Sequence, residues 1–296
     1  MRTFTPNIWF AGDAEEAADL YTRALPATTL TSTVRYPTEG LLPFQEPLAG
    51  QVLTLQLEGP GCDLVLINAG PEFRPTPASS FTVTFGAADD ARAVAALDAA
   101  AEVLATDGRV LVPLERYPFS DRCTWVEDRY GVSWQLTVAS PDAPAEASIV
   151  PTLLFGGPAQ GRAAEAIAEW TALLPGSEVV RTVPYAEATG PATTGTVMFA
   201  EVILAGQRTF LMDAGSEQAT TFTPAVSYQL ACPDQAEIDR LWAVLSTVPE
   251  AEQCGWCTDR FGVSWQIVPA HMDELMARPH AYEHMMEMTK LVIDDF

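Results

Sequence analysis

The chain has 296 residues, of which 48% are hydrophobic, which is enough to build globular cores and argues against global disorder. Its formal net charge of −23 repels phosphate backbones and anionic lipid, so the composition excludes nucleic-acid and membrane partners. No stretch approaches the roughly 18 apolar residues of a membrane span, the first residues lack the anatomy of a signal peptide, and the five cysteines are irregularly spaced. We therefore expect a cytoplasmic protein.

The chain begins with a strand, a helix and further strands. Residues 5–10 have the pattern of a short strand, and a helix is expected to follow, with Asp13 as its N-cap and Glu16 in a capping-box relation. Apolar and polar side chains alternate in Val52–Leu57, and Cys62–Asn68 is another short apolar run. Both segments are predicted to be strands.

The same order recurs before residue 140. Apolar residues alternate with threonines in Phe81–Phe85, a helix is expected over about 88–104, and strands are expected near 109–116, 123–127 and 132–138. The pattern predicts an α+β fold in which paired βαβββ units form a curved, mixed or antiparallel sheet with the helices on one face.

A second copy of this pattern occupies the rest of the chain. The segments Cys123–Gln135 and Cys254–Gln266 agree at ten of thirteen positions when one Tyr-to-Phe exchange counts as agreement. Thr5–Phe10 and Val150–Phe155 also match, in the same order, so the chain is predicted to be a tandem repeat. We expect a short insertion in the first helix of copy two, and a longer hairpin near residues 108–122 in copy one only.

These patterns divide the chain into four parts. Residues 1–140 are predicted to form domain one, residues 141–148 a linker rich in Pro and small residues, and residues 149–270 domain two. Asp234 is expected to cap the second helix of domain two. Residues 271–296 form a C-terminal helical extension, whose methionines are expected to pack against the domains or against a second chain.

Two motifs resemble those of the vicinal-oxygen-chelate superfamily, which includes glyoxalase I, the bleomycin-resistance proteins and the extradiol dioxygenases. Trp-Phe-x-Gly-x-Ala-Glu-Glu-Ala begins at Trp9, and Asp-Arg-[Tyr/Phe]-Gly-Val-Ser-Trp-Gln begins at Asp128 and at Asp259. The resemblance is closest to the PhnB-like branch, described as 3-demethylubiquinone-9 3-methyltransferase-like, and covers essentially the whole chain. It implies two glyoxalase-like domains around cavities, an intramolecular pseudo-dimer of the two copies, and room for a further homodimer.

Metal-using members of that superfamily take His or Glu ligands from the first and fourth strands of each βαβββ pair. The resemblance places the corresponding positions near eight residues, four in each copy: Asn7, Asn68, Ser80 and Gln135, and then Thr152, Asp213, Ser227 and Gln266. None is histidine, and amides and hydroxyls bind transition metals poorly, so we expect no metal and no other cofactor. His280 and His284 in the extension are a weak alternative metal pair.

The remaining motifs favour packing over chemistry. Cys254 and Cys257 have C-x-x-C spacing, but they lie on a predicted strand rather than at the start of a helix. Adjacent Glu127 and Asp128 are interpreted as a solvated turn instead of an acid–base pair. The glycine-rich segment 155–161 lacks the Lys and Ser/Thr that a phosphate-binding P-loop needs.

Alternation near the end of each copy indicates which side chains turn towards a cavity. Trp134 is expected to pack under the helices, so that Gln135 faces the cavity and its amide either orients a ligand or bonds neighbouring strands. Gln266 takes the same place in copy two. Trp9 shares the face of Asn7 and is expected either to line the cavity or to belong to the core.

These observations favour a metal-independent small-molecule-binding protein that holds its ligand near Gln135 and Gln266, in the manner of bleomycin-resistance proteins. One alternative is a glyoxalase-like lyase, isomerase or transferase that uses non-histidine groups such as Asp213 or Glu201 for acid–base chemistry. Another alternative is a structural pseudo-dimer whose cavities are degenerate.

Overall fold

The computed structural model describes residues 4–139 and 145–296, so the first half of the predicted linker, residues 141–144, lies outside the described residues. Copy one contains two units. The first comprises β1 (Phe4–Phe10), α1 (Ala14–Ala24), β2 (Thr29–Arg35), β3 (Val52–Glu58) and β4 (Asp63–Asn68). The second comprises β5 (Ser79–Ala87), α2 (Ala91–Ala105), β6 (Arg109–Tyr117), β7 (Ser120–Glu127) and β8 (Ser133–Ala139).

Copy two repeats this order with one strand fewer. Its first unit comprises β9 (Ser148–Phe155), α3 (Ala163–Leu173), β10 (Glu178–Pro184), β11 (Val197–Leu204) and β12 (Gln207–Asp213). Within residues 226–269 its second unit comprises β13 (Val226–Cys232), α4 (Gln235–Leu245), β14 (Trp256–Thr258) and β15 (Ser264–Pro269). The hairpin of β6 and β7 is therefore confined to copy one, as expected.

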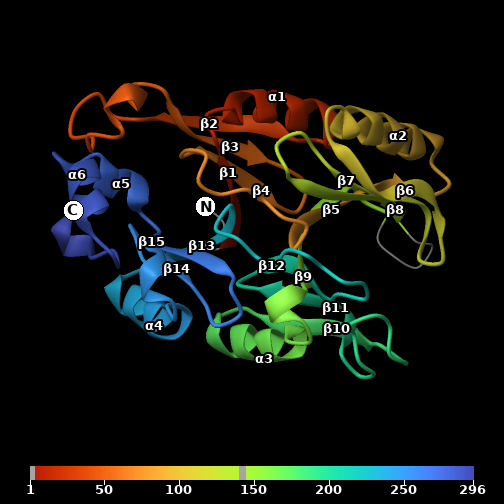
Figure 1. Cartoon of the computed structure of the whole chain (residues 1–296). Coiled ribbons are helices and arrows are strands. Elements are labelled where there is room, and N and C mark those ends of the chain that lie inside the picture. The colour runs from red at the N-terminus through yellow and green to blue at the C-terminus, as the bar shows by residue number, and fades with distance from the viewer. Residues whose placement is uncertain (1–3, 140–144) are drawn as a thin grey trace.

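Each of the two sheets is built from both copies. Sheet A has the strand order β14-β15-β13-β1-β4-β3-β2, and sheet B has the order β10-β11-β12-β9-β5-β8-β7-β6. Copy one thus gives its first unit to sheet A and its second to sheet B, and copy two does the reverse (Figure 1). The α+β class is confirmed, and the two copies are joined as the subunits of a dimer with shared sheets would be.

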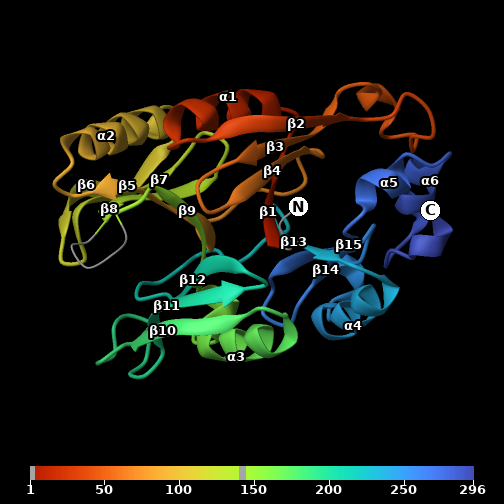
Figure 2. The ribbon, with the colours of Figure 1, turned by 180° about the vertical axis from the view of Figure 1, so that it is seen from behind.

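The helices lie in two outer layers. Figures 1 and 2 show α1 and α2 along one side of the molecule and α3 and α4 along the opposite side. Between them, helix-facing side chains of both sheets, such as Ile8, Trp134 and Leu153, form one continuous hydrophobic core. We call the other side of each sheet its helix-free face. In the part of the chain that the structure describes, no helix is long and apolar enough to cross a membrane.

Two expectations about helix starts are corrected. Asp13 occupies the N-cap position of α1, but its side chain makes no capping hydrogen bond; instead Asn68 Oδ1 accepts the Ala14 N–H at 2.9 Å. The insertion of copy two lies before α3 rather than in it, as the 3-10 turn η2 (Gly157–Ala159), because α1 and α3 both have 11 residues. Asp234 caps α4 as expected by accepting a backbone N–H.

The aspartate of the repeated motif is buried, so the prediction of a solvated turn at Asp128 is wrong. Its carboxylate, which is 3% exposed, accepts hydrogen bonds from Tyr21 Oη at 2.8 Å and from Trp134 Nε1 at 2.9 Å. The backbone N–H groups of Tyr130 and Val132 donate to the same carboxylate. Asp128 therefore ties the helix of the first unit to the last strand of the second.

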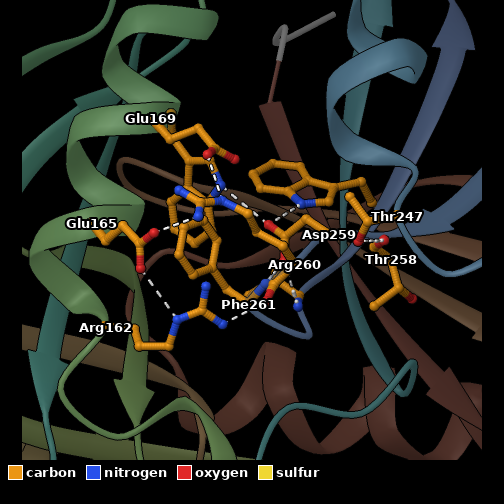
Figure 3. Close-up of polar contacts among 11 residues, drawn as sticks. Arg162, Glu165, Glu169, Thr247, Thr258, Asp259, Arg260 and Phe261 are labelled. Atoms are coloured by element: carbon orange, nitrogen blue, oxygen red, sulfur yellow. Dashed lines mark hydrogen bonds and ion pairs between the residues drawn. The ribbon is translucent and has the colours of Figure 1, made fainter.

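Asp259 repeats this arrangement in copy two (Figure 3). It accepts hydrogen bonds from Trp170 Nε1 at 3.1 Å, from Trp265 Nε1 at 2.9 Å and from two backbone N–H groups of the following turn. Burial raises the pKa of Asp259 to about 6, although these donors oppose the shift. The motif thus specifies the junction between the units of a copy, which is a structural role.

The C-terminal extension forms α5 (Met272–Met276) and α6 (Ala281–Glu287) and bridges both copies. Its methionines surround a small second core centred on Leu275 and Leu291. Tyr282 on α6 accepts a hydrogen bond from Gln45 Nε2 at 2.9 Å, and its ring lies 6.4 Å from that of Tyr36. Figure 1 shows α6 beside the long connection between β2 and β3, so the extension spans from copy two to copy one on this side of the molecule.

Candidate functional site

Most of the predicted site residues gather at the two junctions between the copies. Sheet A brings together Asn7, Ser227 and Gln266. Sheet B brings together Ser80, Gln135 and Thr152. The expected grouping by copy is wrong, because β1 pairs with β13 and β5 pairs with β9, so that each group combines residues of both copies.

On sheet A, amides and aromatic rings share the helix-free face. Gln266 Nε2 donates to Ser227 Oγ at 2.9 Å, and Asn7 donates to a carbonyl of its own strand. The ring of Trp9 lies 5.8 Å from that of Trp256 in an edge-to-face arrangement, and Trp9 Nε1 donates to a backbone carbonyl at 2.6 Å. The polar groups of this junction are therefore bonded within the protein.

On sheet B, the same junction carries hydroxyls and one amide. Gln135 Nε2 donates to Ser80 Oγ at 3.0 Å, which matches the bond between Gln266 and Ser227 in sheet A. Thr152 Oγ1 lies 2.8 Å from Thr82 Oγ1. Trp134 is fully buried on the helix side, so the predicted orientation of Gln135 towards the opposite face is confirmed.

Two side chains outside the predicted set lie on the same face of sheet B. Ser133 is fully buried, and its Oγ has no hydrogen-bond partner among residues 4–139 and 145–296; the Nε1 atom of Trp125 is buried and has none among these residues either. Trp125 lies directly opposite Gln135 in the pairing of β7 with β8. The equivalent of Ser133 in copy two, Ser264, has its Oγ 3.5 Å from a threonine hydroxyl. Ser133 could have been predicted on this face, because it lies two residues before Gln135 on the same strand. Trp125 could not, because a tryptophan on a strand more often belongs to the hydrophobic core.

Strands β10, β11 and β12, at the other end of sheet B, carry a charged and aromatic cluster. Glu201 Oε1 accepts from Arg208 Nε at 2.6 Å, and its second oxygen lies 3.5 Å from Arg181 Nε. The guanidinium of Arg208 lies over the ring of Phe210, and that of Arg181 lies over Phe199. Glu201, an alternative acid–base group, is therefore already paired with two cations.

Asn68 and Asp213 lie apart from the other predicted residues, on the helix side of their strands. Asn68 caps α1, and Asp213 Oδ1 equivalently accepts the Ala163 N–H at 3.1 Å at the start of α3. The second oxygen of Asp213 accepts the Val197 N–H at 2.8 Å. Burial raises the pKa of Asp213, but both of its oxygens are committed to backbone donors. Both residues therefore stabilise the starts of helices α1 and α3.

The side chains at these junctions do not fit the metal centre of metal-using relatives. The donors are neutral amides and hydroxyls, which are already bonded to one another, and such groups are poor transition-metal ligands. Within residues 4–139 and 145–296, no three His, Cys, Asp or Glu side chains are grouped to hold a metal ion. His280 and His284 have ring centroids 6.3 Å apart, and His280 faces solvent beside Glu283.

The C-x-x-C pair has the properties of packing residues. Cys257 is 1% exposed, and burial raises the pKa of its thiol and that of Cys254. A reactive thiol needs a lowered pKa, because the thiolate is the nucleophile.

Comparison with known proteins places this geometry in context. A family model described as 3-demethylubiquinone-9 3-methyltransferase matches residues 2–137 and 147–268. The chain is similar to a PhnB protein from Bacillus cereus, with 33% identity, a TM-score of 0.38, and coverage of 46% of this chain and 98% of that chain. No curated protein matches the chain.

Two solved structures of glyoxalase I from Zea mays resemble the whole chain. One, a mutant, is 13% identical with a TM-score of 0.53, and the match covers 92% of this chain and 95% of that chain. The other is 11% identical with a TM-score of 0.50, covering 96% of this chain and 97% of that chain. These neighbours share the vicinal-oxygen-chelate fold.

Proposed function

Since the chain belongs to the PhnB-like 3-demethylubiquinone-9 3-methyltransferase family of the vicinal-oxygen-chelate superfamily, we propose that it binds a small organic molecule without a metal. The site is the helix-free face of sheet B, around Gln135, Ser80 and Thr152, with Ser133 and Trp125 beside them. Asn7, Trp9, Ser227 and Gln266 form the equivalent, weaker candidate on sheet A.

One observation carries the proposal. Ser133 Oγ and Trp125 Nε1 are buried on one face and have no hydrogen-bond partner in the part of the chain that the structure describes. A buried polar group left unpaired costs about 1–3 kcal/mol, so native proteins rarely keep two together without a use for them. An indole N–H can only donate, so the ligand carries a hydrogen-bond acceptor, such as a carbonyl or carboxylate oxygen, near Trp125.

The surroundings support sheet B over sheet A. On sheet A, the equivalent of Ser133 has a hydroxyl neighbour, and the C-terminal extension reaches across to the β2–β3 connection. On sheet B, strands β10 to β12 carry Phe199, Phe210 and the two arginines that are paired with Glu201. Those groups provide apolar contact and positive charge for the rest of a ligand.

The test begins with native mass spectrometry of the purified protein. If nothing is retained, a thermal-shift screen follows with small organic molecules that carry carbonyl or carboxylate oxygens, and with cationic glycopeptides as ligands of the opposite charge. For any ligand found, Trp125→Phe removes the five-membered ring of the indole with its N–H group and keeps a six-membered aromatic ring. We expect it to weaken binding about tenfold. Trp256→Phe is the matched control in copy two, and we expect it to leave affinity unchanged.

Ser133→Ala and Ser264→Ala form a second matched pair. Loss of affinity in Ser133→Ala alone supports the site on sheet B. A ligand whose affinity falls with Trp256→Phe and Ser264→Ala instead moves the site to sheet A. If no ligand is retained or found, the proposed binding of a small molecule is contradicted, and a structural pseudo-dimer with degenerate cavities is favoured instead.

A further inference from the structure

A cavity of about 140 Å³ lies at one corner of copy one. It is formed by the β1–α1 turn, the β4–β5 connection and the β7–β8 turn. Its walls include the aromatic rings of Phe73 and Tyr130, together with Asp13. Trp9 lines it and also belongs to the weaker candidate on sheet A, whereas Gln135, Ser80 and Thr152 of the site on sheet B do not line it.

Copy two shows the same corner filled by its own side chain. Helices α1 and α3 begin at Ala14 and Ala163, so the residue before each, Asp13 and Arg162, occupies the equivalent N-cap position. Tyr130 and Phe261 are likewise equivalent, two residues after the buried aspartate of each motif. Each copy is thus an internal comparison for the other.

In copy two the occupant is a guanidinium group. The guanidinium carbon of Arg162 lies 4.5 Å from the centroid of the Phe261 ring, and its Nε lies 3.3 Å from Glu165 Oε2 (Figure 3). Its Nη1 donates to the carbonyl of Arg260 at 2.6 Å. A planar cation over an aromatic face with a carboxylate beside it is a favourable arrangement.

In copy one the ring, the acid and one of the two cations are retained. The guanidinium carbon of Arg129 lies 5.0 Å from the centroid of the Tyr130 ring, as that of Arg260 lies 4.6 Å from that of Phe261, but the second cation, Arg162, has no counterpart. Tyr130 replaces Phe261 and Glu16 replaces Glu165, whereas the short Asp13 stands where Arg162 would fill the space. The carboxylate of Asp13 makes no capping hydrogen bond and borders the cavity. We infer that this cavity binds the guanidinium group of a small-molecule ligand, stacked on Tyr130 and paired with Asp13.

Two arginines also line the cavity, and their charge opposes a cation. Arg129 donates to Tyr130 Oη at 2.8 Å and lies 3.9 Å from Glu16, which offsets part of its charge. Together with Arg74 and Asp13, which also line the cavity, these side chains sum to zero formal charge. The net charge of −23 then attracts cations over anions.

The probe is methylguanidinium, titrated by calorimetry into the full-length protein, with sodium benzoate as an anionic comparison. We expect one saturable site for methylguanidinium. Asp13→Asn should weaken it about tenfold, and Asp19→Asn, which removes an equal charge from an exposed position of α1, should leave it unchanged. Asp13→Arg should abolish binding by supplying the guanidinium from the chain itself.

The reciprocal variant, Arg162→Ala, opens the equivalent corner of copy two. We expect methylguanidinium to bind it with a stoichiometry of two and to raise its melting temperature more than that of the wild type. The inference is overturned if the wild type shows no saturable methylguanidinium binding or binds benzoate alone. It is equally overturned if Asp13→Asn and Asp19→Asn have equal affinities.

Discussion

Asn7 and Ser227 stand directly opposite each other in the antiparallel pairing of β1 with β13, although they belong to different copies of the repeat. Ser80 and Thr152 make the equivalent pairing in sheet B. Each copy therefore completes both sheets of the other, and the polar junction on each sheet exists only when the two copies are assembled.

Shared sheets and one continuous core make unfolding cooperative across the repeat. We expect the chain to unfold in a single calorimetric transition, with equal calorimetric and van't Hoff enthalpies, because neither copy retains a complete sheet when the other unfolds. Two resolved transitions, each assignable to one copy, would show that the copies are independent domains.

Substitution of a buried aspartate of the repeated motif, Asp128 or Asp259, should destabilise the fold strongly. Asp259→Ala removes the common acceptor of two indole N–H groups and two backbone N–H groups, so we expect a loss of about 2–4 kcal/mol in the free energy of unfolding. Urea denaturation measures it. The control is Asp239→Ala, on an exposed face of α4, and a loss for Asp259→Ala no larger than that of the control would refute a structural role.

The same carboxyl group makes stability depend on pH. The pKa of Asp259 is raised to about 6 in the folded state, against about 3.9 when unfolded. Between those values the folded state binds more protons, so the stability contributed by this group falls as pH rises. Relative to the wild type, the free energy of unfolding of Asp259→Asn should rise by about 2 kcal/mol between about pH 4 and about pH 7. A stability difference that stays constant over this range contradicts the raised pKa.

The contact between the C-terminal extension and copy one should be measurable on its own. Tyr282→Phe removes the acceptor of the buried Gln45 amide, so we expect a cost of about 1 kcal/mol and faster hydrogen exchange in the β2–β3 connection. Tyr117→Phe also deletes one hydroxyl, but its hydrogen bond to the Pro113 carbonyl is exposed, so that this carbonyl can bind water instead. Equal effects of the two variants would mean that the extension does not hold the connection.

Local periodicity and the repeat predicted much of this structure. Alternation correctly placed Trp134 under the helices and Gln135 on the opposite face, because side-chain direction in a strand depends only on sequence neighbours. Asp234 was recognisable as an N-cap for the same local reason.

Properties that depend on distant partners were not predictable. The sequence does not reveal that β1 pairs with β13, so the site residues could be named but not grouped. The cap of α1 is Asn68, which lies on β4, and not the neighbouring Asp13. Asp128 is buried beneath Tyr21 and Trp134, which both donate hydrogen bonds to it. Polar residues in a motif can thus be structural or functional, and only their tertiary hydrogen bonds distinguish the two.

The most direct test of metal-independent binding is elemental analysis combined with native mass spectrometry of the protein as purified, before and after treatment with a chelator. We expect a retained or screened organic ligand whose binding survives the chelator, with transition metals well below one per chain. A stoichiometric metal whose removal abolishes ligand binding would contradict the proposal and place the protein among the metal-dependent members of its superfamily.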